Sequence, residues 1–313
     1  MKYSGIGGQA VIEGIMMMKG EDYAVAVRRS DKEIEVKKDT YQSITKKAKI
    51  LQLPFVRGVF RFADSMIIGM RSLSYSASFF EDDEDAEPGK FEQLLDRVFG
   101  EKLESAIMAA VLVISFILAI GIFMLLPLGI ANLFKGVITS DHLMAVLEGV
   151  IRIAIFIIHI KLVSRMEDIR RTFMYHGAEH KTIFCYEAGL PLTVENVRIQ
   201  PRHHPRCGTS FLFVVIFVSI LVSSVVFGIW PITNVWLRTL AHLILLPLVV
   251  GITYEFNRWV GRHVQDSRLA KILTAPGMWM QNFTTNEPDD SMIECAIRSL
   301  ELVLPSEKGK DEW

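Results

Sequence analysis

Four long apolar segments limit what this chain can fold into. They cover residues 106–126, 143–163, 211–230 and 236–256 of the 313-residue sequence. A helix needs about 20 predominantly apolar residues to cross the hydrocarbon core of a bilayer, and each segment approaches or reaches that length. A soluble protein could bury one such helix, but hardly four. The sequence therefore predicts an α-helical integral membrane protein with four transmembrane helices.

The charges of the loops predict an orientation. Residues 164–210, between the second and third segments, carry seven arginine and lysine residues, whereas the loop after the first segment carries only Lys135. Basic loops remain in the cytosol, so we expect this loop and both termini to be cytosolic. The predicted parts are a cytosolic segment 1–105, a membrane domain 106–256 and a cytosolic helical tail 257–313.

Composition argues against a nucleic-acid-binding protein and limits the chemical forms that the cysteines are expected to take. The formal net charge is −1, so there is no excess of basic residues to neutralise the phosphates of a nucleic acid. Three cysteines without a secretory signal do not form a disulfide framework. In a reducing cytosol, Cys185 and Cys207 are expected to be thiols or metal ligands. Membrane lipid is the one partner that composition alone predicts.

The segments outside the membrane indicate a mixed α+β cytosolic portion built from the N-terminal segment, the middle loop and the C-terminal tail. Residues 23–41 alternate around a polar centre and predict a β-hairpin, whereas residues 5–20 show no clear period. A helix is predicted over 54–78, either on the membrane surface or in the cytosolic core. Residues 81–89 form an acidic linker, and an amphipathic helix follows over 91–103.

The tail is expected to hold two helices. The first covers residues 266–273 and is expected to end at the "TAPG" sequence that follows. The second begins near Ser291, where the spacing of Ser291 and Glu294 is typical of a capping box. Its apolar stripe needs a surface to pack on; the stripe consists of Ile293, Ile297, Leu300 and Leu304.

The stretch "YHGAEHKTIFCYEAG" contains the main candidate site. Residues 164–187 lack proline and precede Gly189, so we expect one helix that continues from the second span. His176 and His180 lie one turn apart on it, with Glu179 between them in the H-x-x-E-H spacing of a zinc-peptidase motif. Two such imidazoles can bind one zinc ion, and the carboxylate could accept a proton. Alternatively, the histidines only hydrogen-bond to neighbouring loops.

A second stretch, "PRHHPRCGTSF", adds candidate ligands on the same side of the membrane. His204 and Cys207 precede the third span, and Glu187 lies on the same stripe of the helix as His180. Imidazole, thiolate and carboxylate together match the ligand preferences of zinc. The candidate metal ligands are therefore His176, His180, His204, Cys207 and Glu187. The turn could instead only place its two arginines against lipid headgroups or carboxylates.

Four motifs resemble the YqhQ-like family of bacterial polytopic membrane proteins. They are "GGQAVIEGIMM" (residues 7–17), "YHGAEHKTI" (175–183), "HPRCGTSF" (204–211) and "TTNEPDD" (284–290). The resemblance extends over nearly the whole chain. It implies the label that this family commonly carries, a predicted metal-dependent enzyme. Its site residues would be His176, Glu179, His180, His204 and Cys207.

Two functions fit these residues. The favoured one is a non-catalytic accessory or regulatory subunit of a larger membrane assembly, with protein translocation or insertion machinery as a guess for the partner. Residues 5–18 and the last helix would be its docking surfaces. The alternative is a zinc-dependent hydrolase, with His176, His180 and Cys207 as ligands and Glu179 as the base. A structural zinc site fills all four positions, so the surplus of candidate ligands favours the accessory role.

The orientation yields a direct prediction. A cysteine introduced beside Arg198 should react only with a membrane-permeant thiol reagent, because the middle loop is expected in the cytosol. Labelling of intact cells with permeant and impermeant maleimides measures this. Reaction with the impermeant reagent from outside would contradict the orientation.

Overall fold

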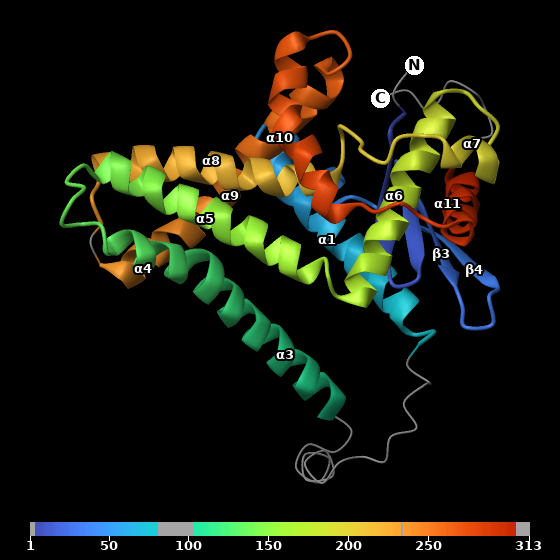
Figure 1. Cartoon of the computed structure of the whole chain (residues 1–313), viewed down its shortest axis with the longest axis horizontal. Helices are drawn as coiled ribbons and strands as arrows, with labels where there is room; N and C mark the ends of the chain where they lie inside the picture. Colours follow the sequence, from blue (N-terminus) through green and yellow to red (C-terminus); the bar gives the residue numbers. More distant parts are fainter. Residues whose placement is uncertain (1–3, 81–102, 233, 305–313) are drawn as a thin grey trace. The chain divides into compact units, whose positions relative to one another are not determined.

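The computed structural model describes residues 4–80, 103–232 and 234–304, and the chain divides into two compact units (Figure 1). Unit 1 combines three separate stretches of sequence, residues 1–80, 159–218 and 245–313. Unit 2 consists of residues 81–158 and 219–244. The predicted acidic linker at 81–89 and nearly all of the predicted helix at 91–103 lie outside the described residues.

Unit 1 contains a four-stranded antiparallel sheet in the order β1-β2-β3-β4. The strands are β1 (Ile6–Val11), β2 (Gly14–Lys19), β3 (Asp22–Arg28) and β4 (Ile34–Thr40). The predicted hairpin is β3–β4, with Tyr23 opposite Asp39. A second hairpin, β1–β2, forms within residues 5–20, where the sequence shows no regular alternation of polar and apolar residues. Its tight turn places Glu13 at a φ of 47°, and a Cβ on Gly14 would lie 2.4 Å from the carbonyl oxygen of Ala26.

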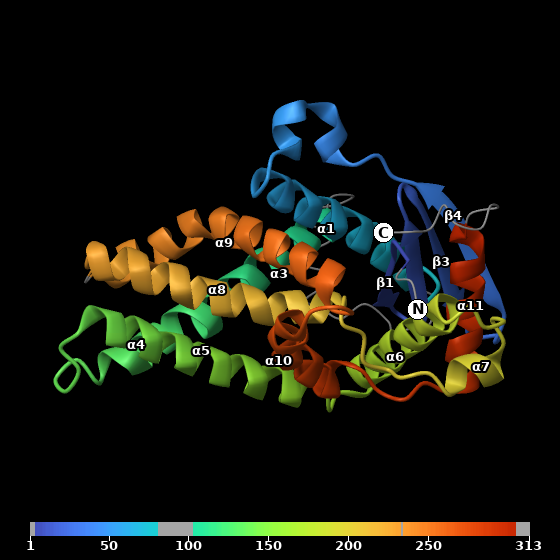
Figure 2. The same ribbon diagram turned by 90° about the horizontal axis from the view of Figure 1, so that it is seen from above.

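Both faces of the sheet are covered, which explains why β2 shows no alternation of polar and apolar residues. Ile15 and Met17 point to one face and pack in a core with helices α6 (Glu167–Glu187) and α11 (Asp290–Val303) (Figure 2). Met16 and Val25 point to the other face, in a core that includes Ile68 of helix α1 (Val56–Ala77). A strand buried on both faces reads as a continuous apolar run rather than an alternating one.

Helix α1 (Val56–Ala77) follows two short 3₁₀ turns, Ile44–Lys47 and Lys49–Gln52. Small and polar residues face the protein, including the buried Gly58 and Ser72. Buried Asp64 accepts hydrogen bonds from the hydroxyl of Ser43 at 2.5 Å and the backbone N–H of Ile44 at 3.0 Å. Several apolar side chains of α1 are exposed instead: Ile67 is 36% exposed and Met70 is 50% exposed.

The middle stretch of unit 1 departs from the predicted continuous helix. Helix α5 (Asp141–Val163) ends, Met166 adopts extended backbone as an N-cap, and α6 (Glu167–Glu187) begins. Two acidic residues in the first turn of α6 favour a new start there, because the N-terminus of a helix attracts negative charge. The predicted end of the helix is confirmed, since Gly189 follows it with a φ of 71°. A short helix, α7 (Val194–Arg198), comes next.

The tail corrects one prediction and confirms another. Helix α10 (Arg268–Thr284) continues through the "TAPG" sequence with Pro276 in its interior, so the predicted break is wrong. Close packing outweighs the lost hydrogen bond there, because a Cβ on Gly277 would lie 2.6 Å from Cβ of Ser210. Helix α11 (Asp290–Val303) forms as predicted, although Asp289 is its N-cap. Its stripe packs on the sheet, and Ile293 and Leu300 are fully buried.

Four helices of the described chain are long and apolar enough to cross a membrane. They cover Ala110–Asn132, Asp141–Val163, Gly208–Ile229 and Val235–His263, the last three being α5, α8 and α9. The first comprises the end of α3 (Leu103–Ile120), a π-helical turn at Gly121–Leu125 and α4 (Leu126–Asn132). These helices match the four predicted segments. Helices α5, α8 and α9 contribute residues to both units.

Candidate metal centre

Helix α6 brings His176 and His180 to the same side. Their rings lie 4.4 Å apart between centroids, as expected for residues one turn apart on a helix. The opposite side of α6 is anchored in the core, where Tyr175 and Ala178 are fully buried with residues of the sheet and α11. This packing fixes the rotation of the helix, and with it the direction of both imidazoles.

Cys207 completes a group of three donors. It lies in the turn immediately before α8, and its Sγ is 3.1 Å from Nε2 of His176. The donor atoms of His176, His180 and Cys207 all lie within 4.8 Å of one another. His180 and Cys207 are buried, whereas His176 is partly exposed. The structure thus places a thiol and two imidazoles, from two separate segments, around one point.

The backbone sets which nitrogen of each histidine faces that point. Nδ1 of His176 lies 2.8 Å from the carbonyl oxygen of Thr284, and Nδ1 of His180 lies 2.6 Å from that of Arg202. A carbonyl oxygen only accepts hydrogen bonds, so each Nδ1 carries the proton. In the neutral rings, Nε2 is then left with its lone pair. Metal-binding histidines are commonly oriented by such a bond from the other ring nitrogen.

Close packing at Gly177 holds the segment that supplies the Thr284 carbonyl. A Cβ at this position would lie 2.0 Å from the carbonyl oxygen of Asn286, so only glycine fits. The backbone N–H of Asn286 also donates a 2.8 Å hydrogen bond to the carbonyl of Phe173. The motif glycine and the "TTNEP" segment are therefore parts of one contact. Both stretches carried the family resemblance, but the sequence did not predict that they touch.

The electrostatics favour metal binding at neutral pH. Burial alone would raise the pKa of the Cys207 thiol, but interactions with His180 and hydrogen bonds from Thr209 outweigh it and lower that pKa. Burial lowers the pKa of His180, which shifts the imidazole toward its neutral form. A thiolate and neutral imidazoles are the forms that bind a transition metal.

Glu179 lies beside the three donors and is 6% exposed. Burial raises the pKa of its carboxyl to about 7, although His176 and a hydrogen bond from the backbone N–H of Gly8 act in the opposite direction. Oε2 of this carboxyl is buried and makes no hydrogen bond within the described residues. A Cβ at Gly8 would lie 2.8 Å from Cδ of Glu179, so strand β1 approaches the carboxyl as closely as it does because residue 8 is glycine.

His204 and Glu187 lie outside the three-donor group, although the ring of His204 is 5.6 Å from that of His180 between centroids. Nδ1 of His204 accepts from the backbone N–H of Arg206 at 3.3 Å, and its Nε2 lies 3.7 Å from Oε2 of Glu187. Glu187 also accepts from the guanidinium of Arg206 and, at 2.7 Å, from the backbone N–H of Ser4. Both side chains, His204 and Glu187, therefore have hydrogen-bond or ion-pair partners outside the three-donor group. Of the five candidate ligands, the structure gathers three and leaves these two outside the group.

Other residues that position the site gave no signal in the sequence. Gln281 on α10 accepts from the backbone N–H of His204 at 2.7 Å and donates to its carbonyl oxygen at 2.8 Å. It thereby fixes the turn that carries Cys207. The backbone N–H of Thr209 donates to Sγ of Cys207 at 3.4 Å. A single buried glutamine in an amphipathic helix has no recognisable spacing, so only the packed structure reveals its role.

The chain matches known relatives over most of its length. The family model described as "Protein of unknown function (DUF1385)" matches residues 53–306. The chain belongs to this family. It is also 34% identical over 298 residues to the "Uncharacterized protein YqhQ" of Bacillus subtilis (strain 168), covering 95% of this chain and 92% of that protein. No solved structure matches the chain.

The family assignment agrees with the resemblance found in the motifs. The matched range begins before α1 and ends just after α11, so it includes all three donors and Glu179. The alignment with the Bacillus protein extends over nearly the whole chain. Strands β1 to β4 precede the range matched by the family model. Neither match describes a reaction, so the chemistry of the site has to be argued from its geometry.

The three-donor group predicts a specific pattern of zinc binding. The metal-free protein should take up one equivalent of zinc, and His176→Ala, His180→Ala or Cys207→Ala should each weaken binding by more than the roughly 10–100-fold cost of losing a supporting residue. His203→Ala, in the same turn, and His204→Ala should retain the zinc affinity of the wild type. Competition with a chromogenic chelator measures the affinity. Loss of zinc in His204→Ala would contradict the three-ligand group.

The buried carboxyl predicts a pH-dependent stability. Folding raises the pKa of Glu179 to about 7, so the metal-free protein should lose stability as pH rises from the ordinary carboxyl range through 7. Glu179→Gln cannot ionise and should melt at a higher temperature than wild type at pH 8, with little difference at pH 4.5. Exposed Glu301→Gln is the control. An equal difference at both pH values would contradict the burial of a charged Glu179.

Proposed function

We propose that this chain is an integral protein of the bacterial cytoplasmic membrane and a zinc-dependent hydrolase that acts at the cytosolic membrane surface. The four apolar helices support membrane insertion. The basic loop between the second and third spans supports cytosolic termini. Under this topology the His176, His180 and Cys207 group lies on the cytosolic side, because it is carried by that loop.

One observation carries the enzymatic proposal: a buried carboxyl with a pKa near 7 lies beside a group of three donors. Three protein ligands are typical of catalytic zinc, which keeps a fourth position for water and activates it as a Lewis acid. A general base works best when its pKa lies near the working pH. Oε2 of Glu179 has no hydrogen-bond partner in the described structure and is free to accept a proton.

The remaining residues orient the site. The carbonyls of Thr284 and Arg202 direct Nε2 of the two histidines toward the metal position, and the hydrogen bonds from Thr209 stabilise the Cys207 thiolate. His176 is the partly exposed donor, so we expect substrate to approach from its side. Two imidazoles and one thiolate favour zinc over magnesium or calcium, which prefer oxygen ligands.

An accessory role is the second candidate, and the exposed face of α1 supports it. Met66 is 52% exposed and Met70 is 50% exposed, and flexible methionines suit an adaptable contact with a protein partner in the membrane. The two docking surfaces predicted from the sequence do not strengthen it. Met16 and Met17 of the first are buried in the sheet, and Leu300 of the last helix is buried against it.

Glu179→Gln separates the two functions. In the hydrolase, losing the general base should lower the rate by about 10²–10⁴-fold and abolish complementation of a null strain. The amide should leave zinc binding intact, because Glu179 is not one of the three donors. Purified zinc-loaded protein, tested on ester, amide and phosphoester substrates, should show the same loss.

Glu301→Gln, on exposed α11 surface, is the matched control and should complement fully. A Glu179→Gln protein that folds, binds zinc and complements as well as wild type would overturn the hydrolase and favour the accessory role. Deleting residues 5–18 would not test docking, since it removes two strands of the sheet.

A further inference from the structure

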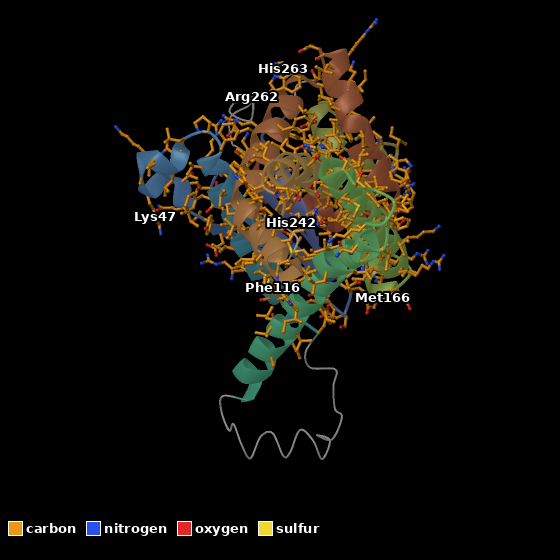
Figure 3. All side chains as sticks on the ribbon, turned by 90° about the vertical axis from the view of Figure 1, so that its left-hand side faces the viewer. Lys47, Phe116, Met166, His242, Arg262 and His263 are labelled. Atoms are coloured by element: carbon orange, nitrogen blue, oxygen red, sulfur yellow. The ribbon has the colours of Figure 1, made fainter. Side chains whose placement is uncertain are left out.

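Unit 2 contains a buried cluster of charged residues that the metal centre does not involve. Its hub is Glu148 on α5, whose side chain is only 4% exposed. Arg152, one turn later, donates to Oε1 of Glu148 at 2.7 Å. From α9, Arg238 donates to Oε2 at 2.8 Å, and Nε2 of His242, labelled in Figure 3, lies 3.2 Å from Oε1. Ser223 on α8 lies 3.2 Å from Nδ1 of His242, and the first span adds the carbonyl of Phe123, so all four candidate spans contribute.

The two arginines of the cluster are not equivalent. Every nitrogen of the Arg152 guanidinium has an acceptor: the carbonyl of Phe123 at 3.0 Å, the hydroxyl of Ser219 at 3.5 Å and the carboxylate of Glu148. Arg152 and Glu148 are thus a matched ion pair. Of the Arg238 donors, Nη2 is bonded to Glu148, whereas Nε is buried without an acceptor within the described residues.

The balance of charges in the cluster also indicates that Arg238 is incompletely paired. With His242 neutral, the cluster holds two permanent cations and one anion. The other acidic side chain that the structure describes in unit 2 is Asp141, which is exposed at the start of α5. One guanidinium charge therefore lacks a buried counter-charge, and such a charge inside a membrane span is costly unless it is paired.

The surroundings of Arg238 suit an anion. Its guanidinium stacks on the ring of Phe227 at 4.6 Å, which holds the planar group in place. Arg238 lies in the first turn of α9, where the helix dipole also favours negative charge. Its side chain is 13% exposed, so the cluster is not sealed.

We propose that Arg238, supported by Phe227 and the Glu148–Arg152 pair, binds the phosphate group of an anionic ligand within the membrane-spanning unit. The guanidinium fork matches phosphate geometry, and the ligand supplies the missing negative charge. Glu148 and Arg152 hold Arg238 in position rather than bind the ligand. This site is independent of the metal centre and of the hydrolase proposal.

The test uses full-length protein in a neutral detergent, freed of co-purified lipid. Its melting temperature is followed during titration with phosphatidylglycerol, with phosphatidylcholine and with inorganic phosphate at constant ionic strength. We expect stabilisation by phosphatidylglycerol. Stabilisation by inorganic phosphate as well identifies a soluble phosphate group as sufficient, whereas a response to phosphatidylglycerol alone identifies the lipid as the source. No stabilisation by either compound overturns the proposal, as does an equal response to phosphatidylcholine.

Two variants make the assignment specific to Arg238. Arg238→Gln should weaken the apparent affinity by about tenfold or more, the cost of losing hydrogen bonds to a charged group. Arg262→Gln, on the same helix but exposed near its other end, is the matched control and should respond as wild type (Figure 3). A wild-type response in Arg238→Gln overturns the proposal.

A second variant covers the case in which Arg238→Gln does not fold. In Glu148→Gln the amide oxygen can still accept the hydrogen bond that positions Arg238, but the negative charge that competes with the ligand is lost, so this variant should bind the phosphate group more tightly than wild type. An unchanged or weaker response would overturn the proposal. A purely structural role for the cluster predicts lower melting temperatures in both variants and no change in ligand affinity.

Discussion

Helix α6 is buried on two sides, and the geometry of the candidate metal centre follows from that burial. On one side, Tyr175 and Ala178 pack in the core with the sheet and α11. On the other side, the carbonyls of Thr284 and Arg202 receive the Nδ1 protons of the two histidines. A helix held on both sides cannot rotate without losing packing or hydrogen bonds. The two imidazoles are therefore preorganised before any metal binds.

This preorganisation changes which function the residues favour. A surplus of candidate ligands in the sequence suggested a closed, structural site. In the folded chain, His204 and Glu187 are engaged with Arg206 and with the backbone at Ser4, which leaves three donors and a neighbouring carboxyl. The same residue types thus separate into a metal group and a structural network. The hydrogen-bond and ion-pair partners of each residue determine whether it joins the metal group or the structural network, because the spacing of the motifs is compatible with either.

Periodic features were predictable, and features set by distant packing were not. Length and hydropathy predicted the spans, and alternation predicted the β3–β4 hairpin. The β1–β2 hairpin was not predicted, because layers on both faces of the sheet cover its strands and remove the alternation of polar and apolar residues. Pro276 was expected to end α10, but contact with Ser210 sustains the helix. In the candidate site, the spacing of His176 and His180 predicted that both imidazoles lie on the same side of one helix. The carbonyl partners and Gln281 could not be predicted, because they lie up to about a hundred residues away.

The assembly of unit 1 from three stretches has a consequence for biosynthesis. The hydroxyl of Ser299, near the end of the chain, bridges the backbone N–H of Met17 and the carbonyl of Ala24 inside the sheet. The first strands leave the ribosome long before α11 is made, and all four candidate spans are synthesised in between. Until then one apolar face of the sheet lacks α11, and of the two helices that cover that face only α6 is present. Completion of this unit therefore requires synthesis through α11, and a product truncated before α11 would expose more of that face to proteases and chaperones.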